Sequence, residues 1–293
     1  MNNESDPGFA VDERPEILIR PDRGARLPDP REIWGYRDLL FLLVRRDFVA
    51  KYRQTVLGPI WFLLQPLMMT LVFTVVFGRV VKVPSDGLPH TLFYLSGLLG
   101  WGYFSQVFST VGTTFVSNAG VMTKVYFPRA VMPLAITASS LIAFVVQFIL
   151  FLGFLTWFWF AMQPDPGFGL GWRTLLLPLV VMHTAIIGLG LGLWMAALTA
   201  KYRDFSHLVP FLTQLLLYAT PVIFPASAVP EAWRWVLFLN PMAANVESYR
   251  LILLGSASVT AVDLLFSVCL AAAIFLSGLF LFQRTSRTFA DYV

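Results

Sequence analysis

The stretch from Tyr52 to Pro66 reads YRQTVLGPIWFLLQP and joins a basic segment to a long apolar one. Arg53 can remain at the level of the lipid headgroups, Gly58 permits a tight turn, and Pro59 suits the first turn of a helix. Trp61 favours the interface between water and hydrocarbon. The stretch therefore predicts a chain that approaches a membrane along its surface and turns sharply into it.

The composition of the whole chain is that of a membrane protein. Of its 293 residues, 57% are apolar and only 13% are charged, whereas a soluble domain carries about 25% charged residues. The lone Cys269 and three scattered histidines show no spacing typical of metal ligands, so no metal site is predicted. Residues 1–30 are rich in proline and mixed charge without a signal-peptide core, which predicts a flexible cytosolic tail.

Six apolar segments approach the roughly 20 residues that a helix needs to cross about 30 Å of hydrocarbon. We therefore expect an all-α polytopic membrane protein whose transmembrane domain occupies residues 56–293. The expected transmembrane helices are Leu57–Val81, Leu92–Val116, Val131–Phe160, Thr174–Leu198, Leu208–Phe224 and Thr260–Phe282.

The segment between the fifth and sixth spans is apolar but interrupted by prolines. Pro225, Pro230 and Pro241 divide it into pieces that are too short to cross a bilayer. Two short re-entrant or interfacial helices are expected, around Glu231–Leu239 and Met242–Leu254.

The distribution of Lys and Arg predicts the orientation. One set of segments holds the N-terminal tail together with Lys124, Arg129, Lys201, Arg203, Arg284 and Arg287. The opposite loops hold Arg79, Lys82, Arg173, Arg234 and Arg250. Because cytoplasmic loops are enriched in basic residues, the first set is assigned to the cytosol and both termini are expected there.

Residues 31–55 predict an amphipathic helix that lies along the membrane surface. Its apolar face is expected to hold Ile33, Leu40, Phe41, Val44, Phe48 and Tyr52. The opposite face carries Asp38, Arg45, Arg46 and Arg53, which suit water or anionic headgroups. The helix is either a plain basic anchor or a surface that contacts a cytosolic partner.

The sequence lacks the motifs that ATP hydrolysis, ion-coupled transport and enzymatic catalysis would need. No Gly-Lys dipeptide occurs, so the chain has no Walker A loop and any ATP must be hydrolysed by another chain. The spans offer little to titrate beyond His183 and Asp263, and the amides Gln65, Gln106, Gln147 and Gln214 cannot relay protons, so ion-coupled transport is disfavoured. Neither an Asp-x-Asp motif nor a nucleophilic motif is present, so an enzyme is a weaker alternative.

The chain resembles the transmembrane subunits of ABC-2 type polysaccharide exporters over nearly all of Tyr36–Val293. The first matching motif contains Tyr52, Arg53, Leu57, Gly58, Trp61 and Pro66, and the second contains Asn118, Lys124, Phe127, Pro128 and Arg129. Further matches are Tyr202-Arg203-Asp204, Thr220-Pro221-Val222, Asn240-Pro241-Met242, Tyr249-Arg250 and the ending Phe289-Ala290-Asp291-Tyr292.

The resemblance implies that the chain works in a complex with other subunits. Two copies of the chain are expected to pair with two ATP-binding subunits, which would bind ATP and Mg while this chain carries no cofactor and binds no nucleic acid. The coupling segment for the ATPase would hold Asn118, Lys124, Phe127, Pro128 and Arg129. The simpler alternative is a short cytosolic turn with two anchoring cations.

The resemblance also implies a lipid-linked polysaccharide substrate in the bacterial inner membrane. The lipid diphosphate is anionic, so Arg45, Arg46, Lys51 and Arg53 beside the Leu57-Gly58 turn are the residues expected to receive it. A glycan presents C–H faces that stack on aromatic rings, and Trp61, Phe62, Trp101 and Tyr103 are the expected channel-lining residues. The other interpretation of these rings is an interfacial aromatic belt.

An O-antigen type glycan is the expected substrate. A capsular polysaccharide or a teichoic acid would use a similar scaffold, and a permease for drugs or lipids is a further alternative. A membrane enzyme acting on lipid-linked sugars is the most remote.

Overall fold

The computed structural model describes residues 30–52, 58–122, 127–162 and 168–288, and these residues form helices and connecting segments with no strand. The helices are α1 (Pro30–Gly35), α2 (Arg37–Tyr52), α3 (Trp61–Phe73), α4 (His90–Gly112), α5 (Thr114–Ser117), α6 (Ala119–Met122), α7 (Val131–Met162), α8 (Leu177–Lys201), α9 (Phe205–Ala219), α10 (Glu231–Phe238), α11 (Pro241–Leu254) and α12 (Ala261–Thr288). Short 3₁₀ segments cover Gly58–Ile60, Trp172–Leu176 and Ala226–Ala228, and a π-helix covers Thr74–Val80.

Four of the described helical segments are long and apolar enough to cross a membrane. They are Trp61–Val80, Val131–Met162, Trp172–Lys201 and Ala261–Ser286, and they coincide with the first, third, fourth and sixth expected spans. The all-helical, multi-pass membrane architecture is thereby confirmed. The other two expected spans are also helical, as α4 and α9, but their crossing of the membrane stays a prediction.

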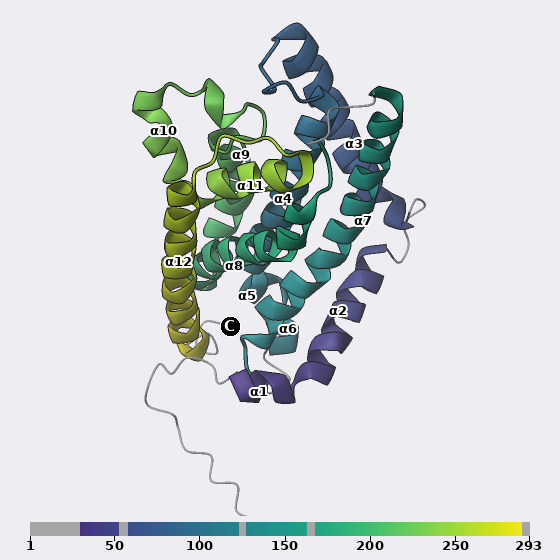
Figure 1. Ribbon diagram of the computed structural model, residues 1–293. Helices are drawn as coiled ribbons and strands as arrows, with labels where there is room; N and C mark the ends of the chain where they lie inside the picture. The colour runs from purple at the N-terminus through teal and green to yellow at the C-terminus, as the bar shows by residue number, and fades with distance from the viewer. Residues whose placement is uncertain (1–29, 53–57, 123–126, 163–167, 289–293) are drawn as a thin grey trace, which may run out of the picture.

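Helix α4 differs from these four because it lies in the interior of the bundle. It packs against α8, α7, α11, α3 and α9 (Figure 1). Its sequence accordingly contains serines, threonines, glycines and a glutamine among the apolar residues, and most of its first half is buried. Small and polar residues of this kind suit a helix whose surface faces other helices.

The contact between α8 and α12 depends on two glycines. A Cβ atom added at Gly278 would lie 2.5 Å from the backbone oxygen of Gly190, and one added at Gly190 would lie 2.9 Å from Cα of Phe275. The two backbones therefore meet directly, as small residues allow in membrane helix pairs. This contact joins α12 firmly to the body of the bundle.

Helices α10 and α11 lie toward the end of the molecule opposite to α1 (Figure 1). They form where the sequence predicts two short helices, and their re-entry into a membrane stays a prediction. Asn240 caps α11 by accepting a hydrogen bond from the Met242 backbone N–H at 3.0 Å, and Pro241 occupies the first turn. Gly255 ends the helix in the left-handed conformation, with φ at 82°.

Helix α11 is buried despite its charges. Glu247 and Arg250 are each 1% exposed, and Arg250 Nη1 lies 2.6 Å from Glu247 Oε1. Glu247 also accepts bonds from the backbone N–H groups of Ala226 and Ser258, each at 3.2 Å. Arg250 donates to the carbonyl oxygen of Val222 at 3.0 Å, and its guanidinium lies 3.7 Å from the ring centre of Phe93. We call these two residues with their partners the α11 ion pair.

The predicted surface helix is divided into two helices, α1 and α2, at Tyr36, and α2 packs against α7. Its inward face holds the buried Leu43 together with Leu39, Leu40 and Val44, which pack on the core. Phe41, expected on the same face, is instead 78% exposed. The difference arises because α2 leans against α7, which selects the strip through Leu39 and Leu43. Residues 1–29 of the predicted tail and residues 53–55 lie outside the described residues, and Pro30 begins α1.

Candidate functional site

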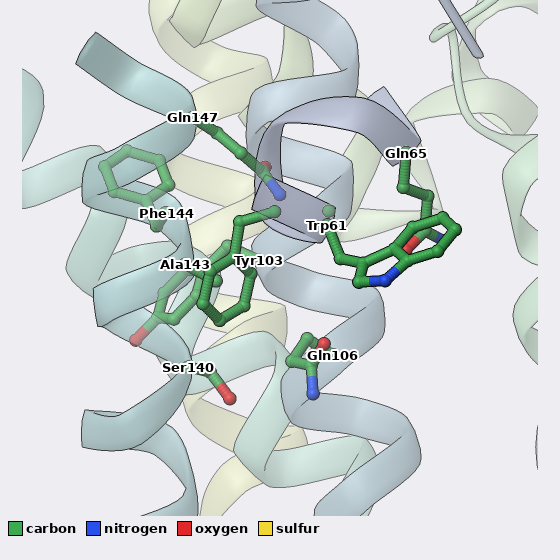
Figure 2. Close-up of a pocket in the computed structure, with 10 residues that line it drawn as sticks. Trp61, Gln65, Tyr103, Gln106, Ser140, Ala143, Phe144 and Gln147 are labelled. Carbon is green, nitrogen blue, oxygen red and sulfur yellow. The ribbon is translucent and has the colours of Figure 1, made fainter. Parts of the chain in front are cut away.

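A cavity of about 190 Å³ lies among α3, α4 and α7. Its walls combine aromatic rings with uncharged polar side chains (Figure 2). The lining residues are Trp61, Phe62, Gln65, Gly102, Tyr103, Gln106, Ser140, Ala143, Phe144 and Gln147. We call this space the upper cavity.

Helical spacing places these side chains on common faces. Trp61 and Gln65 are four residues apart on α3, as are Ser140 and Phe144 on α7, and residues at this spacing lie on the same side of a helix. Figure 2 shows the α3 pair across the cavity from the α7 residues.

Gly102 makes room for Gln147 in the upper cavity. A Cβ atom at position 102 would lie 3.1 Å from Gln147 Oε1, and Gln147 reaches toward the centre of the cavity (Figure 2). The absence of a side chain on α4 therefore permits an amide to enter from α7.

Three of the four aromatic residues expected to line a channel meet at this cavity. Trp61 is 48% exposed, whereas Phe62 and Tyr103 are buried. The Tyr103 hydroxyl donates to the Thr137 carbonyl oxygen at 3.4 Å. Trp101 does not line the cavity, because it is buried with its ring centre 5.1 Å from that of Phe104.

A second cavity of about 270 Å³ adjoins the first, and we call it the lower cavity. The two share Phe62, Gln106, Ser140 and Ala143 as walls. The lower cavity is further lined by Asp47, Phe48, Ala50, Thr110, Asn118, Ile136 and Ser139. Together they extend from the α3–α4–α7 contact to the C-terminal half of α2 and the turn between α5 and α6.

The residues expected to receive a lipid diphosphate are described only in part. Arg45 is exposed on α2, and Arg46 is half-buried. Gly58 has φ at 51°, in the left-handed region that glycine adopts without strain. The Lys51 side chain, Arg53 and Leu57 lie outside the described residues.

Arg46 connects this basic segment to the expected coupling segment. Its Nη2 lies 2.7 Å from Asp47 Oδ1 and donates to Asn118 Oδ1 at 3.2 Å. Within the coupling segment, Phe127 is buried, Pro128 and Arg129 are partly exposed, and Lys124 lies outside the described residues. The basic segment and the coupling segment, whose contacting residues Arg46 and Asn118 are 72 residues apart in sequence, are therefore in contact.

The sequence profile of the family described as ABC-2 type transporter matches residues 38–254, which is well over half of the chain. The chain belongs to the ABC-2 type transporter family. This ABC-2 permease is 33% identical to an O-antigen export system permease protein RfbA of Myxococcus xanthus, covering 76% of this chain and 82% of that protein. It is 26% identical to the RfbA permease of Klebsiella pneumoniae, covering 73% and 79%.

A more distant relative is the polysialic acid transport protein KpsM of Escherichia coli, which is 24% identical over 73% of this chain and 79% of that protein. These relatives are named as transport components rather than enzymes. The ABC-2 permease is accordingly a membrane transport subunit, and members of this family work with an ATPase partner.

Sequence analysis of the ABC-2 permease missed several residues of the site. Gln65, Gln106 and Gln147 were noted only as poor proton carriers, although isolated amides in apolar helices are themselves a signal of an interior polar surface. Ser140 and Phe144 carried no signal, since their place in the wall depends on how α7 packs against α4. Arg250 was counted as a loop cation but is buried in the α11 ion pair. Glu247 lies three residues before Arg250, a spacing at which two helical side chains are neighbours, and this spacing could have indicated the ion pair.

Proposed function

We propose that this ABC-2 permease exports a lipid-linked polysaccharide of the O-antigen type across the bacterial inner membrane. Two copies would form the channel, with two ATP-binding subunits attached at the cytosolic side. All six helical segments α3, α4, α7, α8, α9 and α12 would span the membrane, with both termini in the cytosol and α10 and α11 as re-entrant helices.

The observation that carries this proposal is the wall of the two adjoining cavities. A sugar ring has polar hydroxyl groups at its edge and apolar C–H groups on its faces. Amides and hydroxyls such as those of Gln65, Gln147 and Ser140 can donate and accept hydrogen bonds, and Trp61 offers a partly exposed ring for stacking. A surface that combines both kinds of group suits a glycan better than a purely apolar drug or lipid.

The basic end of α2 supports entry of the lipid end of the substrate near the lower cavity. Arg45 is exposed there, and Lys51 and Arg53 follow in sequence. A diphosphate would pair with such cations through charge-assisted hydrogen bonds. The left-handed Gly58 turn would then lead from this site into α3 and the upper cavity.

The contact between Arg46 and Asn118 supports a route for coupling to ATP. The segment Asn118–Arg129 would dock on the ATP-binding subunit, which holds ATP and Mg. A displacement of this segment would reach α2 through the hydrogen bond of 3.2 Å. A displacement of the coupling segment by the ATP-binding subunit would therefore also move the basic segment that receives the lipid diphosphate.

The proposal is tested by purifying the chain with its ATP-binding partner and measuring export of a lipid-linked glycan in inside-out vesicles. Export is expected to require ATP and to fall at least about tenfold in the variant Trp61→Ala, with ATP hydrolysis retained. Trp159→Ala is the matched control, since Trp159 is 53% exposed on α7 and lines neither cavity. An ATP-independent signal would refute the exporter, and normal export by Trp61→Ala would remove the cavities from the substrate path.

A further inference from the structure

The described walls of the two cavities are almost free of charge, although the lower cavity borders the basic end of α2. Of the described residues that line them, Asp47 alone carries a formal charge. Its carboxylate accepts from Arg46 at 2.7 Å, so this charge is already paired. The polar remainder consists of neutral amides and hydroxyls: Gln65, Tyr103, Gln106, Thr110, Asn118, Ser139, Ser140 and Gln147.

Such a wall treats neutral and acidic sugars differently. A hydroxyl group of a neutral sugar both donates and accepts hydrogen bonds, and so does each amide side chain. The hydrogen bonds that the sugar made with water outside can therefore be replaced by hydrogen bonds with the cavity wall. A carboxylate or phosphate on the glycan loses hydration in a narrow space and meets no cation among the described lining residues. Burying an unpaired charge is far more costly than burying a paired polar group.

The cost to an acidic glycan recurs along its length. The lipid diphosphate enters once per molecule and has the basic residues of α2 beside its proposed site. An acidic polymer, by contrast, brings a new charge into the cavities with every repeat unit. Each repeat adds a barrier of the same kind, so the rate of passage would be limited throughout export.

We propose that the upper and lower cavities select an uncharged polysaccharide, built of neutral sugars, over a polyanionic one. This inference rests on the proposed function and narrows its substrate class. It separates this permease from exporters of sialic acid polymers and phosphate-rich teichoic acids. Gln147 is the most informative position, because its amide reaches into the upper cavity (Figure 2). Gly102 leaves room for that amide, since a Cβ atom added at position 102 would lie 3.1 Å from its oxygen.

The test compares two polymers in vesicles that contain the permease and its ATPase. Both carry the same polyprenyl diphosphate and the same number of repeats, and one has a carboxylate in each repeat while the other is neutral. The neutral polymer is expected to be exported at least about tenfold faster than the acidic one. Equal rates, or faster export of the acidic polymer, would overturn the inference while leaving the exporter intact.

A cation placed in the wall provides the second measurement. The variant Gln147→Lys is expected to raise the ratio of acidic to neutral export by about tenfold, because the ammonium pairs with each passing carboxylate. The matched control is Gln283→Lys on α12, which adds the same charge outside both cavities and is expected to leave the ratio unchanged.

The ratio is measured within one preparation, so partial loss of folded protein cancels. An unchanged ratio in Gln147→Lys, or an equal rise in Gln283→Lys, would overturn the inference. Absence of ATP-dependent export for both polymers with the unaltered chain would instead overturn the proposed function, and the inference with it.

Discussion

The α11 ion pair and the two cavities both place polar groups inside an apolar bundle, but they do so in opposite ways. Around Glu247 and Arg250, charged atoms meet one another, backbone groups and the Phe93 ring within a densely packed region. Around Gln65 and Gln147, neutral side chains border open space. The comparison indicates that the first region specifies the fold, whereas the second has polar surface that a passing ligand can use.

The largest effect is expected where a charge loses its partner. Arg250→Ala would leave Glu247 buried without its cation, which costs about 3–5 kcal/mol of folding free energy. Equilibrium unfolding in mixed micelles measures the loss, with Arg45→Ala as a control because Arg45 is exposed on α2. A loss below about 1 kcal/mol in Arg250→Ala would mean that the pair does not stabilise the fold.

A smaller loss is expected from a methyl group in the packed region. Gly278→Ala would push a Cβ atom against the Gly190 carbonyl oxygen, and overpacking of this kind costs about 1–3 kcal/mol. Gly153→Ala on α7 meets no atom within 4 Å and is expected to stabilise its helix by up to about 1 kcal/mol. The same unfolding measurement applies, and effects of equal sign would contradict the assigned packing.

An intermediate case lies at the edge of the lower cavity, where Arg46 bonds to Asn118. Asn118→Ala removes one partly buried hydrogen bond, so unfolding free energy is expected to fall by about 0.5–1.5 kcal/mol. If the bond also links α2 to the ATPase, export per ATP hydrolysed will fall as well. Unaltered coupling with reduced stability would confine Asn118 to a structural role.

The smallest effect on stability is expected inside the upper cavity. Gly102→Ala brings a Cβ atom within 3.1 Å of Gln147 Oε1, but this amide borders open space and can move aside. Unfolding free energy is expected to stay within about 0.5 kcal/mol of the parent, while glycan export declines because the Gln147 amide is displaced. A large loss of stability would show that the cavity is packed as tightly as the α8–α12 contact.

The sequence predicted the helices well, because the length and apolarity of a membrane helix are local properties. Both termini of α11 were nearly right for the same reason, since Asn240-Pro241 and Gly255 are local signals. Trp101 and Tyr103 were grouped as lining residues, yet residues two apart point to nearly opposite sides of a helix. Of the partners of Arg250, only Glu247 lies at a helical spacing that the sequence shows; Val222 lies 28 residues away and the Phe93 ring belongs to a different helix, so neither could be predicted.

The direct contact of Gly190 and Gly278 has a consequence for the transport cycle. Two helices whose backbones touch cannot slide past each other without a steric clash, so α8 and α12 are expected to move as one rigid body. The structural change that accompanies each ATP hydrolysed must then occur elsewhere. The left-handed residue Gly58, at the start of the segment leading into α3, is a suitable hinge. The helix that moves would then be α3, which lines the cavities, whereas the α8–α12 pair, which lines neither cavity, would stay fixed.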